Sequence, residues 1–433
     1  MIGLDGFVLM IGLMLALLLG GMWIPFALGL AGVVAIWLSS GTNAMLAVGL
    51  VSWSSTNSFT LTSVPMFILM AEILQKSGAT TRFYNGLTRI VRGLPGGLLQ
   101  TNIVGCAFFA AVSGSSVATA ASIGTAALPQ LAQRGYDRPM AAGSLAAGGT
   151  LGILIPPSIP MIIYGTLTET SIAKLFMAGV IPGILLTLFF MAFIAVAALR
   201  RPGVAPTDSE IIPLLVKLRA IRDLLPMVIL MSVVLGSLYA GVATPTESAG
   251  LGCAIALVVA LFWGDLTWRS IRIALTATVR TSCTIMMIVL MAYVFSYGVE
   301  TTNIGENLTK WLVGLELSKT EFMLVLIVLY SILGCLIDSL GMIVLTVPLL
   351  FEPIRAYGFD PVWFGIMLVL LLEFGQITPP VGINLFVVQS ISGWSLGDVV
   401  RGSVPYWVIM LLFMGLLMAM PQMALWLPAQ MFR

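Results

Sequence analysis

Long apolar runs constrain this sequence more than any other feature. The stretch from Phe176 to Leu199 carries no charged residue, and another long run begins at Leu4. A helix needs ~20 predominantly apolar residues to cross a bilayer, and both runs approach or exceed that length. Only 9% of all residues are charged, whereas soluble domains have ~25%. The sequence therefore predicts an all-α polytopic membrane protein embedded in a lipid bilayer.

Several function classes are disfavoured by what the chain lacks. It contains no histidine, which removes the commonest metal ligand and proton shuttle and argues against a serine–histidine intramembrane protease. There is no Walker A sequence, so ATP is not expected to be an energy source within this chain. The net charge of +2 indicates no nucleic-acid partner. The four cysteines stand singly in apolar runs and are predicted to be small buried side chains.

The chain contains an internal repeat. Gly135-Tyr136-Asp137 recurs as Gly358-Phe359-Asp360, and Gly152 with Pro156-Pro157 recurs as Gly375 with Pro379-Pro380 at the same offset of 223 positions. A constant offset over several landmarks indicates a duplicated unit. We predict a first repeat over residues 1–199, a linker over 200–223 and a second repeat over 224–433.

The two repeats are predicted to have opposite orientations. Lys and Arg concentrate on cytoplasmic loops. Residues 76–138 hold six of them, the equivalent window 299–361 holds three, and the polar linker adds five more. The basic segment TTRFYNGLTRIVRGLPGG and the linker, with a short amphipathic helix, should therefore face the cytoplasm. Inverted repeats with interrupted helices are a transporter architecture.

The threading that follows has about ten crossings, two re-entrant helical hairpins and two unwound Pro-Pro helix breaks, with both termini outside the cytoplasm. In the first repeat it places spans at about 4–21, 24–40 and 60–76, a hairpin at 96–134, a broken crossing at 139–167 and a last span at 172–199. The predicted parts are scaffold spans over 1–93 and 224–317, a hairpin with a broken helix over 94–170 and 318–392, and closing spans over 171–199 and 393–433.

Four stretches interrupt the helical pattern in apolar surroundings. They are SGSSVAT at 113–119, GGTLGILIPPS at 148–158, CLIDSLGM at 335–342 and EFGQITPPVGIN at 373–384. Proline lacks the amide hydrogen, so two in succession unwind a helix locally. Unpaired backbone groups at membrane depth occur where protein or a cavity satisfies them. Freed carbonyls can coordinate Na⁺, and half-helix N-termini suit a substrate carboxylate.

Two acidic residues lie close to these interruptions. Asp338 is predicted at the second hairpin tip, where an apolar setting makes a carboxylate costly and a functional role the default hypothesis; a helix cap is the alternative. Glu373 precedes the second break. Glu72 lies four residues before Lys76 and is expected to pair with it, and Glu247 is a candidate capping carboxylate.

The motifs resemble a known family. The run FAAVSGSSVATAASIGTAALPQLAQRGYDRPMAAG, followed by GGTLGILIPPSIPMIIYG, is similar to the large membrane subunit of tripartite ATP-independent periplasmic (TRAP) transporters, the DctM-like M subunit. GVATPTESAG and FGQITPPVGINLFV extend the resemblance into the second repeat. The resemblance implies a Na⁺-coupled secondary importer of organic acid anions, working by an elevator mechanism and similar in fold to divalent anion/Na⁺ symporters.

The resemblance, laid over the predicted topology, also implies where ligands bind. One Na⁺ site is expected between the first tip and the first break, and a second between the second tip and the second break. The candidate Na⁺ ligands are Ser113, Ser115, Gly148, Gly152 and Pro156 in the first repeat, and Asp338, Ser339, Gly341, Gly375, Thr378 and Pro379 in the second. The candidate substrate-binding residues are Ser116, Thr119, Pro157, Ser158 and Asn384.

The family further implies two protein partners, a periplasmic substrate-binding protein (P type) and a small membrane subunit (Q type). The chain starts directly with the large-subunit pattern, so the small subunit is expected as a separate chain in the bacterial inner membrane. The alternatives are a stand-alone anion/Na⁺ symporter, a channel, and an intramembrane enzyme using Ser113 or Asp338, which is not expected. Proton coupling through Asp338 or Glu373 stays open, and the sequence does not name the organic acid.

Overall fold

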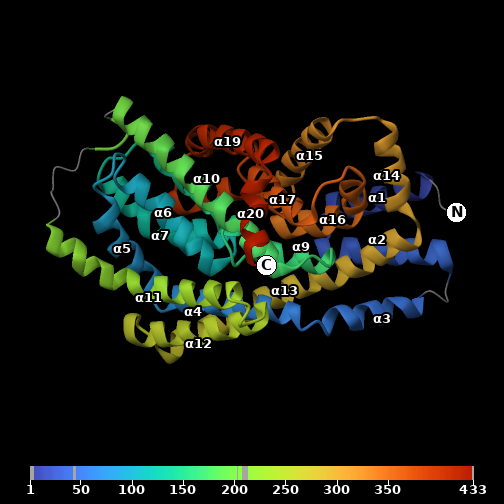
Figure 1. Cartoon of the computed structure of the whole chain (residues 1–433), viewed down its shortest axis with the longest axis horizontal. Helices are drawn as coiled ribbons and strands as arrows, with labels where there is room; N and C mark the ends of the chain where they lie inside the picture. Colours follow the sequence, from blue (N-terminus) through green and yellow to red (C-terminus); the bar gives the residue numbers. More distant parts are fainter. Residues whose placement is uncertain (1–3, 42–44, 202, 207–212, 432–433) are drawn as a thin grey trace.

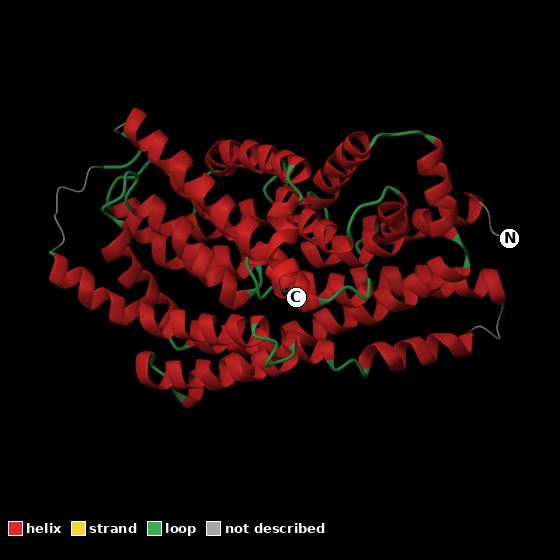
Figure 2. Cartoon of the chain, viewed as in Figure 1, coloured by secondary structure: helices red, strands yellow, loops and turns green. Residues whose placement is uncertain are grey.

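The chain folds into helices connected by short loops. The computed structural model describes residues 4–41, 45–201, 203–206 and 213–431. Across these residues it contains helices and loops and no strand (Figure 2). This agrees with the predicted all-α class.

Ten α-helices and one 3₁₀ helix lie in the described part of residues 1–201 (Figure 1). Their bounds are α1 Leu4–Leu19, α2 Ile24–Ser40, α3 Met45–Thr56, η2 Thr60–Thr62, α4 Ser63–Lys76, α5 Ala79–Val91, α6 Leu98–Ser113, α7 Ser116–Gln133, α8 Arg138–Leu154, α9 Ile159–Leu167 and α10 Ile172–Arg200. The helix α3 has no counterpart in the predicted threading, which started its third span at about residue 60. Its axis is bent by 54° from the helical stretch Thr60–Lys76 that follows.

The remaining helices follow from residue 214. Their bounds are α11 Leu214–Tyr239, α12 Pro245–Trp263, α13 Trp268–Thr301, α14 Ile304–Gly314, α15 Lys319–Gly334, α16 Ser339–Ala356, α17 Pro361–Gln376, α18 Ile383–Ser392, α19 Leu396–Ala419 and α20 Gln422–Met431. The predicted linker boundary at residue 223 lies inside α11, because the amphipathic start of this helix continues directly into an apolar segment.

Many of these helices are long and apolar enough to cross a membrane. Within the described residues, six meet both conditions alone, and up to eight spans result if each of two bent pairs counts as one. The chain is thus a multi-pass membrane protein. The predicted total of about ten crossings stays a prediction, since α1 and α2, with 16 and 17 residues, fall just short of a full span.

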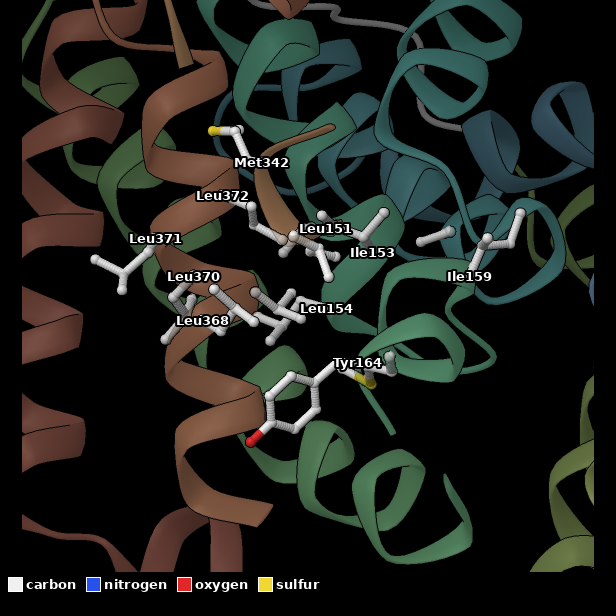
Figure 3. Close-up of a cluster of buried hydrophobic side chains, with 14 of the residues drawn as sticks. Leu151, Ile153, Leu154, Ile159, Tyr164, Met342, Leu368, Leu370, Leu371 and Leu372 are labelled. Carbon is white, nitrogen blue, oxygen red and sulfur yellow. The ribbon is translucent and has the colours of Figure 1, made fainter. Parts of the chain in front are cut away.

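Part of the hydrophobic core lies where α8 meets α17. Figure 3 shows Leu151 and Leu154 of α8 facing Leu370 and Leu372 of α17, and all four are fully buried. The rest of α8 is lined by Ala and Gly, and the first hairpin, α6 with α7, packs against it. Small residues permit this close packing of helices where water supplies no driving force.

Helices from the two parts of the chain interlock. The segment after the second break, α18, packs against α7 of the first hairpin, and the segment after the first break, α9, packs against α16 of the second hairpin. Likewise α19 lies against α8, and α13 lies against α2. The two hairpins are therefore held by helices that are distant in the sequence.

The basic segment predicted for the cytoplasmic surface forms α5, which is anchored to α11. Arg82 Nε lies 3.0 Å from Asp223 Oδ1, and Arg89 Nη1 lies 3.9 Å from Asp223 Oδ2. Half of each arginine side chain is exposed, so the pairs contribute only ~0–1 kcal/mol. The pairs therefore hold α5 against α11 and add little to the free energy of unfolding.

Candidate functional site

The first hairpin turns at Gly114. The helix α6 ends at Ser113, Gly114 adopts a left-handed conformation with φ 58°, and Ser115 caps α7 by accepting a hydrogen bond from the Ala118 amide at 3.4 Å. The Ser113 hydroxyl lies 3.2 Å from the Ser115 carbonyl oxygen and 2.7 Å from Thr119 Oγ1. Ser113, Ser115 and Thr119 thus form one compact set of neutral oxygens.

This tip packs against the first break. The Ile159 amide donates to the Gly114 carbonyl at 3.4 Å. A methyl group on Gly152 would lie only 2.7 Å from the Ser115 carbonyl oxygen and 2.8 Å from Thr119 Oγ1. Glycine is therefore required for α8 to approach the tip this closely. The predicted residues Ser113, Ser115 and Gly152 come together here.

The other residues predicted for the first break do not contact the hairpin tip in this way. A side chain on Gly148 would meet Cys106 of α6 at 2.9 Å, so this position packs against the hairpin stem. Pro156 and Pro157 are joined by a cis peptide bond, and Pro156 lies near Gly179 of α10. Ser158 accepts from the Met161 amide at 3.4 Å and caps α9. The break is closed mainly by such local caps.

The second hairpin tip carries the predicted aspartate. Asp338 caps α16, and its Oδ1 accepts a hydrogen bond from the Gly341 amide at 3.3 Å. The side chain of Ser339, the first residue of α16, is 9% exposed. The capping role does not exclude ligand binding, because a carboxylate has further acceptor sites.

The second break contacts the end of α15. A methyl group on Gly375 would lie 2.6 Å from the Tyr330 carbonyl oxygen. Cys335 Sγ lies 3.8 Å from the Thr378 carbonyl oxygen and 3.9 Å from that of Pro379. The Thr378 hydroxyl donates to Phe374 O at 2.6 Å and accepts from Trp407 Nε1 at 2.9 Å. Gly375, Thr378 and Pro379 thus gather around the stem of the second hairpin.

Both tips reach one cavity of about 410 Å³. The tips contribute a continuous stretch from Ser113 to Ala118 and another from Asp338 to Leu340. The opposite walls come from α4, which includes Glu72, and from α13, which includes Arg280. The Ser116 hydroxyl donates to Gln376 Oε1 at 2.6 Å, which joins the first tip to the end of α17. The two hairpins therefore meet at a shared, mainly apolar space whose polar lining includes hydroxyl, carboxyl and guanidinium groups.

The cavity includes only part of the predicted substrate set. Ser116 lines it, whereas Thr119, Pro157, Ser158 and Asn384 are buried behind the wall. The amide group of Asn384 and both carboxyl oxygens of Glu373 lack a hydrogen-bond partner among the described residues. Both groups are buried and do not line the cavity.

Two lining residues were not predicted. Gln376 is a polar residue at the end of the apolar helix α17, and Arg280 is a charged residue in the interior of the long helix α13; such positions are signals for function in a membrane protein. The expected Glu72–Lys76 pair is confirmed at 3.8 Å, and Glu247 forms a capping box with Thr244.

Comparison with known proteins identifies the family. Residues 11–423 match the family described as the tripartite ATP-independent periplasmic transporter, DctM component. The chain belongs to the DctM family. This confirms the resemblance seen in the motifs around both tips and both breaks.

Relatives in this family align over almost the whole chain. The C4-dicarboxylate TRAP transporter large permease protein DctM of Pseudomonas aeruginosa is 34% identical over 93% of each chain. The sialic acid TRAP transporter large permease protein SiaM of Vibrio cholerae is 29% identical over 96% of each. The isethionate TRAP transporter permease protein DctMQ of Oleidesulfovibrio alaskensis is 31% identical, and only 64% of its length is covered.

A solved structure has the same fold as this DctM-family chain. The crystal structure of the Alcanivorax borkumensis YdaH transporter superposes with a TM-score of 0.66 over 93% of this chain and 96% of that one, at 14% identity. At this identity the likeness concerns the fold alone. The family and the fold together describe a multi-pass transporter permease.

Proposed function

We propose that this chain is the membrane-embedded transport subunit of a Na⁺-coupled importer of organic acid anions in the bacterial inner membrane. The carried anion is a dicarboxylate, a sialic acid or a similar carboxylate, which a periplasmic binding protein delivers. The observation that carries this proposal is the cavity shared by both hairpin tips. Family membership and the substrates named for the relatives support it.

The tips offer the chemistry that an organic anion requires. Ser116 and Ser339 are the first residues of α7 and α16, and both line the cavity. A helix N-terminus carries about half a positive charge, with backbone amides pointing outward. Two such ends directed at one space favour a carboxylate between them. The Ser116 hydroxyl adds a hydrogen-bonding group.

The coupling ion is proposed to bind behind the first tip. The Ser113 hydroxyl is within hydrogen-bonding range of both the Ser115 carbonyl oxygen and the Thr119 hydroxyl, and neutral oxygens are the ligands that a hard cation prefers. Because Gly152 packs directly on the Ser115 carbonyl, an ion bound here would stabilise the docked tip. Na⁺ binding would in this way prepare the substrate site.

The cavity walls suggest how substrate crosses the membrane. One side is formed by the hairpins, and the other by α4 and α13. We propose an elevator movement in which α6–α9 and α15–α18 shift against α4 and α13, with the small membrane subunit extending the fixed part as a separate chain. Movement of the tips along a wall that stays in place would expose the substrate alternately to the two sides.

Uptake by the purified protein tests this proposal. Proteoliposomes containing this chain and its small subunit should accumulate a carboxylate only when the binding protein and inward-directed Na⁺ are both present. Uptake that persists when choline replaces Na⁺ at fixed pH contradicts the coupling. Uptake of free substrate without the binding protein would favour the stand-alone symporter.

A further inference from the structure

One wall of the cavity carries a cation that forms no ion pair with the described residues. Arg280 lines the cavity from α13, together with Thr281 and Thr284. Arg280 takes part in none of the ion pairs given for the described residues, such as those of Lys76, Arg82 and Lys310. Its guanidinium group thus has its charge and donors available.

Arg280 lies well inside its helix. It follows Trp268, the first residue of α13, by twelve positions, which places it ~18 Å along the axis at 1.5 Å per residue. Arg269 and Arg272 are close to the helix start and suit the membrane surface, but Arg280 lies two turns deeper. An arginine within a membrane segment costs about 2.5–3.5 kcal/mol or more, so its position calls for a function.

The side chain belongs to the face of α13 that is directed toward the tips. Arg280, Thr284 and Ile288 recur every fourth residue and all line the cavity, as residues on one helix face do. This face is polar at Arg280, Thr281 and Thr284, and apolar at Ile285 and Ile288. An elongated anion with one charged end matches such a surface.

The acidic residues of the cavity already have partners. Glu72 pairs with Lys76 at 3.8 Å, and Asp338 Oδ1 accepts from the Gly341 amide. Arg280 is the basic side chain of the cavity lining. It and the N-termini of α7 and α16 are the groups there that attract an anion.

We propose that Arg280 is the specificity-determining residue on α13 that binds a carboxylate of the transported anion while the same anion lies at Ser116. The inference rests on the proposed function. Guanidinium binds a carboxylate through two parallel hydrogen bonds, which a lysine cannot reproduce. Because Arg280 belongs to α13 and not to a hairpin, it contacts the substrate only while the tips face this cavity.

Cysteine labelling tests the placement of the charge without any substrate. In a background carrying Cys283→Ser and Cys335→Ser, Thr281→Cys is treated with an anionic sulfonatoethyl and a cationic trimethylammonium methanethiosulfonate. Arg280→Gln should lower the ratio of anionic to cationic labelling rates about tenfold, since a nearby unit charge acts oppositely on the two reagents. Arg272→Gln, on the same helix outside the cavity, should leave the ratio within twofold. An unchanged ratio in Arg280→Gln, or a Thr281→Cys that reacts with neither reagent, overturns the proposal.

Transport kinetics test the binding role. The probes are the carboxylates succinate and N-acetylneuraminate, supplied with the cognate partner proteins in proteoliposomes. For the probe that the wild type carries, Arg280→Gln should raise KM tenfold or more, as expected for a lost charge-assisted pair. Arg280→Lys should raise KM less, and Arg272→Gln should stay within twofold. An unchanged KM in Arg280→Gln contradicts the inference. A wild type that carries none of the probes contradicts the proposed function instead, and the labelling ratio then still decides whether the cation faces the cavity.

Discussion

Replacing Gly152 by alanine is expected to separate the first hairpin tip from the first break. The added methyl group would lie 2.7 Å from the Ser115 carbonyl oxygen, against the 3.4 Å at which ordinary contact begins. A backbone oxygen cannot rotate away, so either α8 or the tip must shift by several tenths of an ångström. Overpacking of this kind costs about 1–3 kcal/mol, which for a chain of this length corresponds to a fall of ~1–3 °C in Tm in a thermal unfolding scan in detergent.

A matched substitution controls for the change in helix propensity. Gly415 lies inside α19, and nothing lies within 4 Å of a methyl group placed there. Alanine favours a helix over glycine by up to ~1 kcal/mol, so Gly415→Ala should hold or raise Tm. The Na⁺ response provides a second readout: Na⁺ should stabilise the wild type and Gly415→Ala, and stabilise Gly152→Ala only at higher concentration. A Gly152→Ala protein with the Tm and the Na⁺ response of Gly415→Ala would refute the close docking of tip and break.

The remaining predictions concern the two tips. Ser116→Ala removes the hydrogen bond to Gln376 and should cost ~1 kcal/mol, with a higher KM for substrate. Ser115→Ala removes the cap of α7 but keeps the carbonyl oxygen, so it should lower the free energy of unfolding by about 0.5–2 kcal/mol. Ser113→Ala removes a hydroxyl of the proposed ion site and should weaken the Na⁺ dependence of uptake; unchanged Na⁺ dependence would remove Ser113 from that site. Asp338→Asn keeps an oxygen for the Gly341 amide, so Tm should hold while transport falls if the charge binds a ligand, whereas Asp338→Ala should lower both. Full transport by Asp338→Asn would leave Asp338 as a helix cap only.

The local features of the fold could be predicted from the sequence because each depends on neighbouring residues. The Pro156-Pro157 and Pro379-Pro380 breaks follow from the missing amide and the ring of proline. The turn at Gly114 follows from a glycine between serines in an apolar run. The family match confirms the resemblance drawn from these motifs.

Other features depend on residues that are far apart in the chain. Ser116 and Gln376 are 260 positions apart, and no periodicity signals that they meet. Gly375 approaches the Tyr330 carbonyl, so the second break lies at the stem of the second hairpin. The expectation that each helix break lies beside a hairpin tip could not foresee this contact. Arg280 lies in the unbroken helix α13, where no interruption of the helical pattern marks its position.

The interlocking of helices has a consequence for biosynthesis. During translation α7 emerges long before α18 covers it, and α8 emerges long before α19. Until then, lipid or an insertion factor must cover the faces of α7 and α8 that later pack against α18 and α19. Contacts between distant segments also slow folding. Neither half should reach a stable state alone, and two halves produced as separate chains split between Arg200 and Leu214 should assemble only when they are synthesised together.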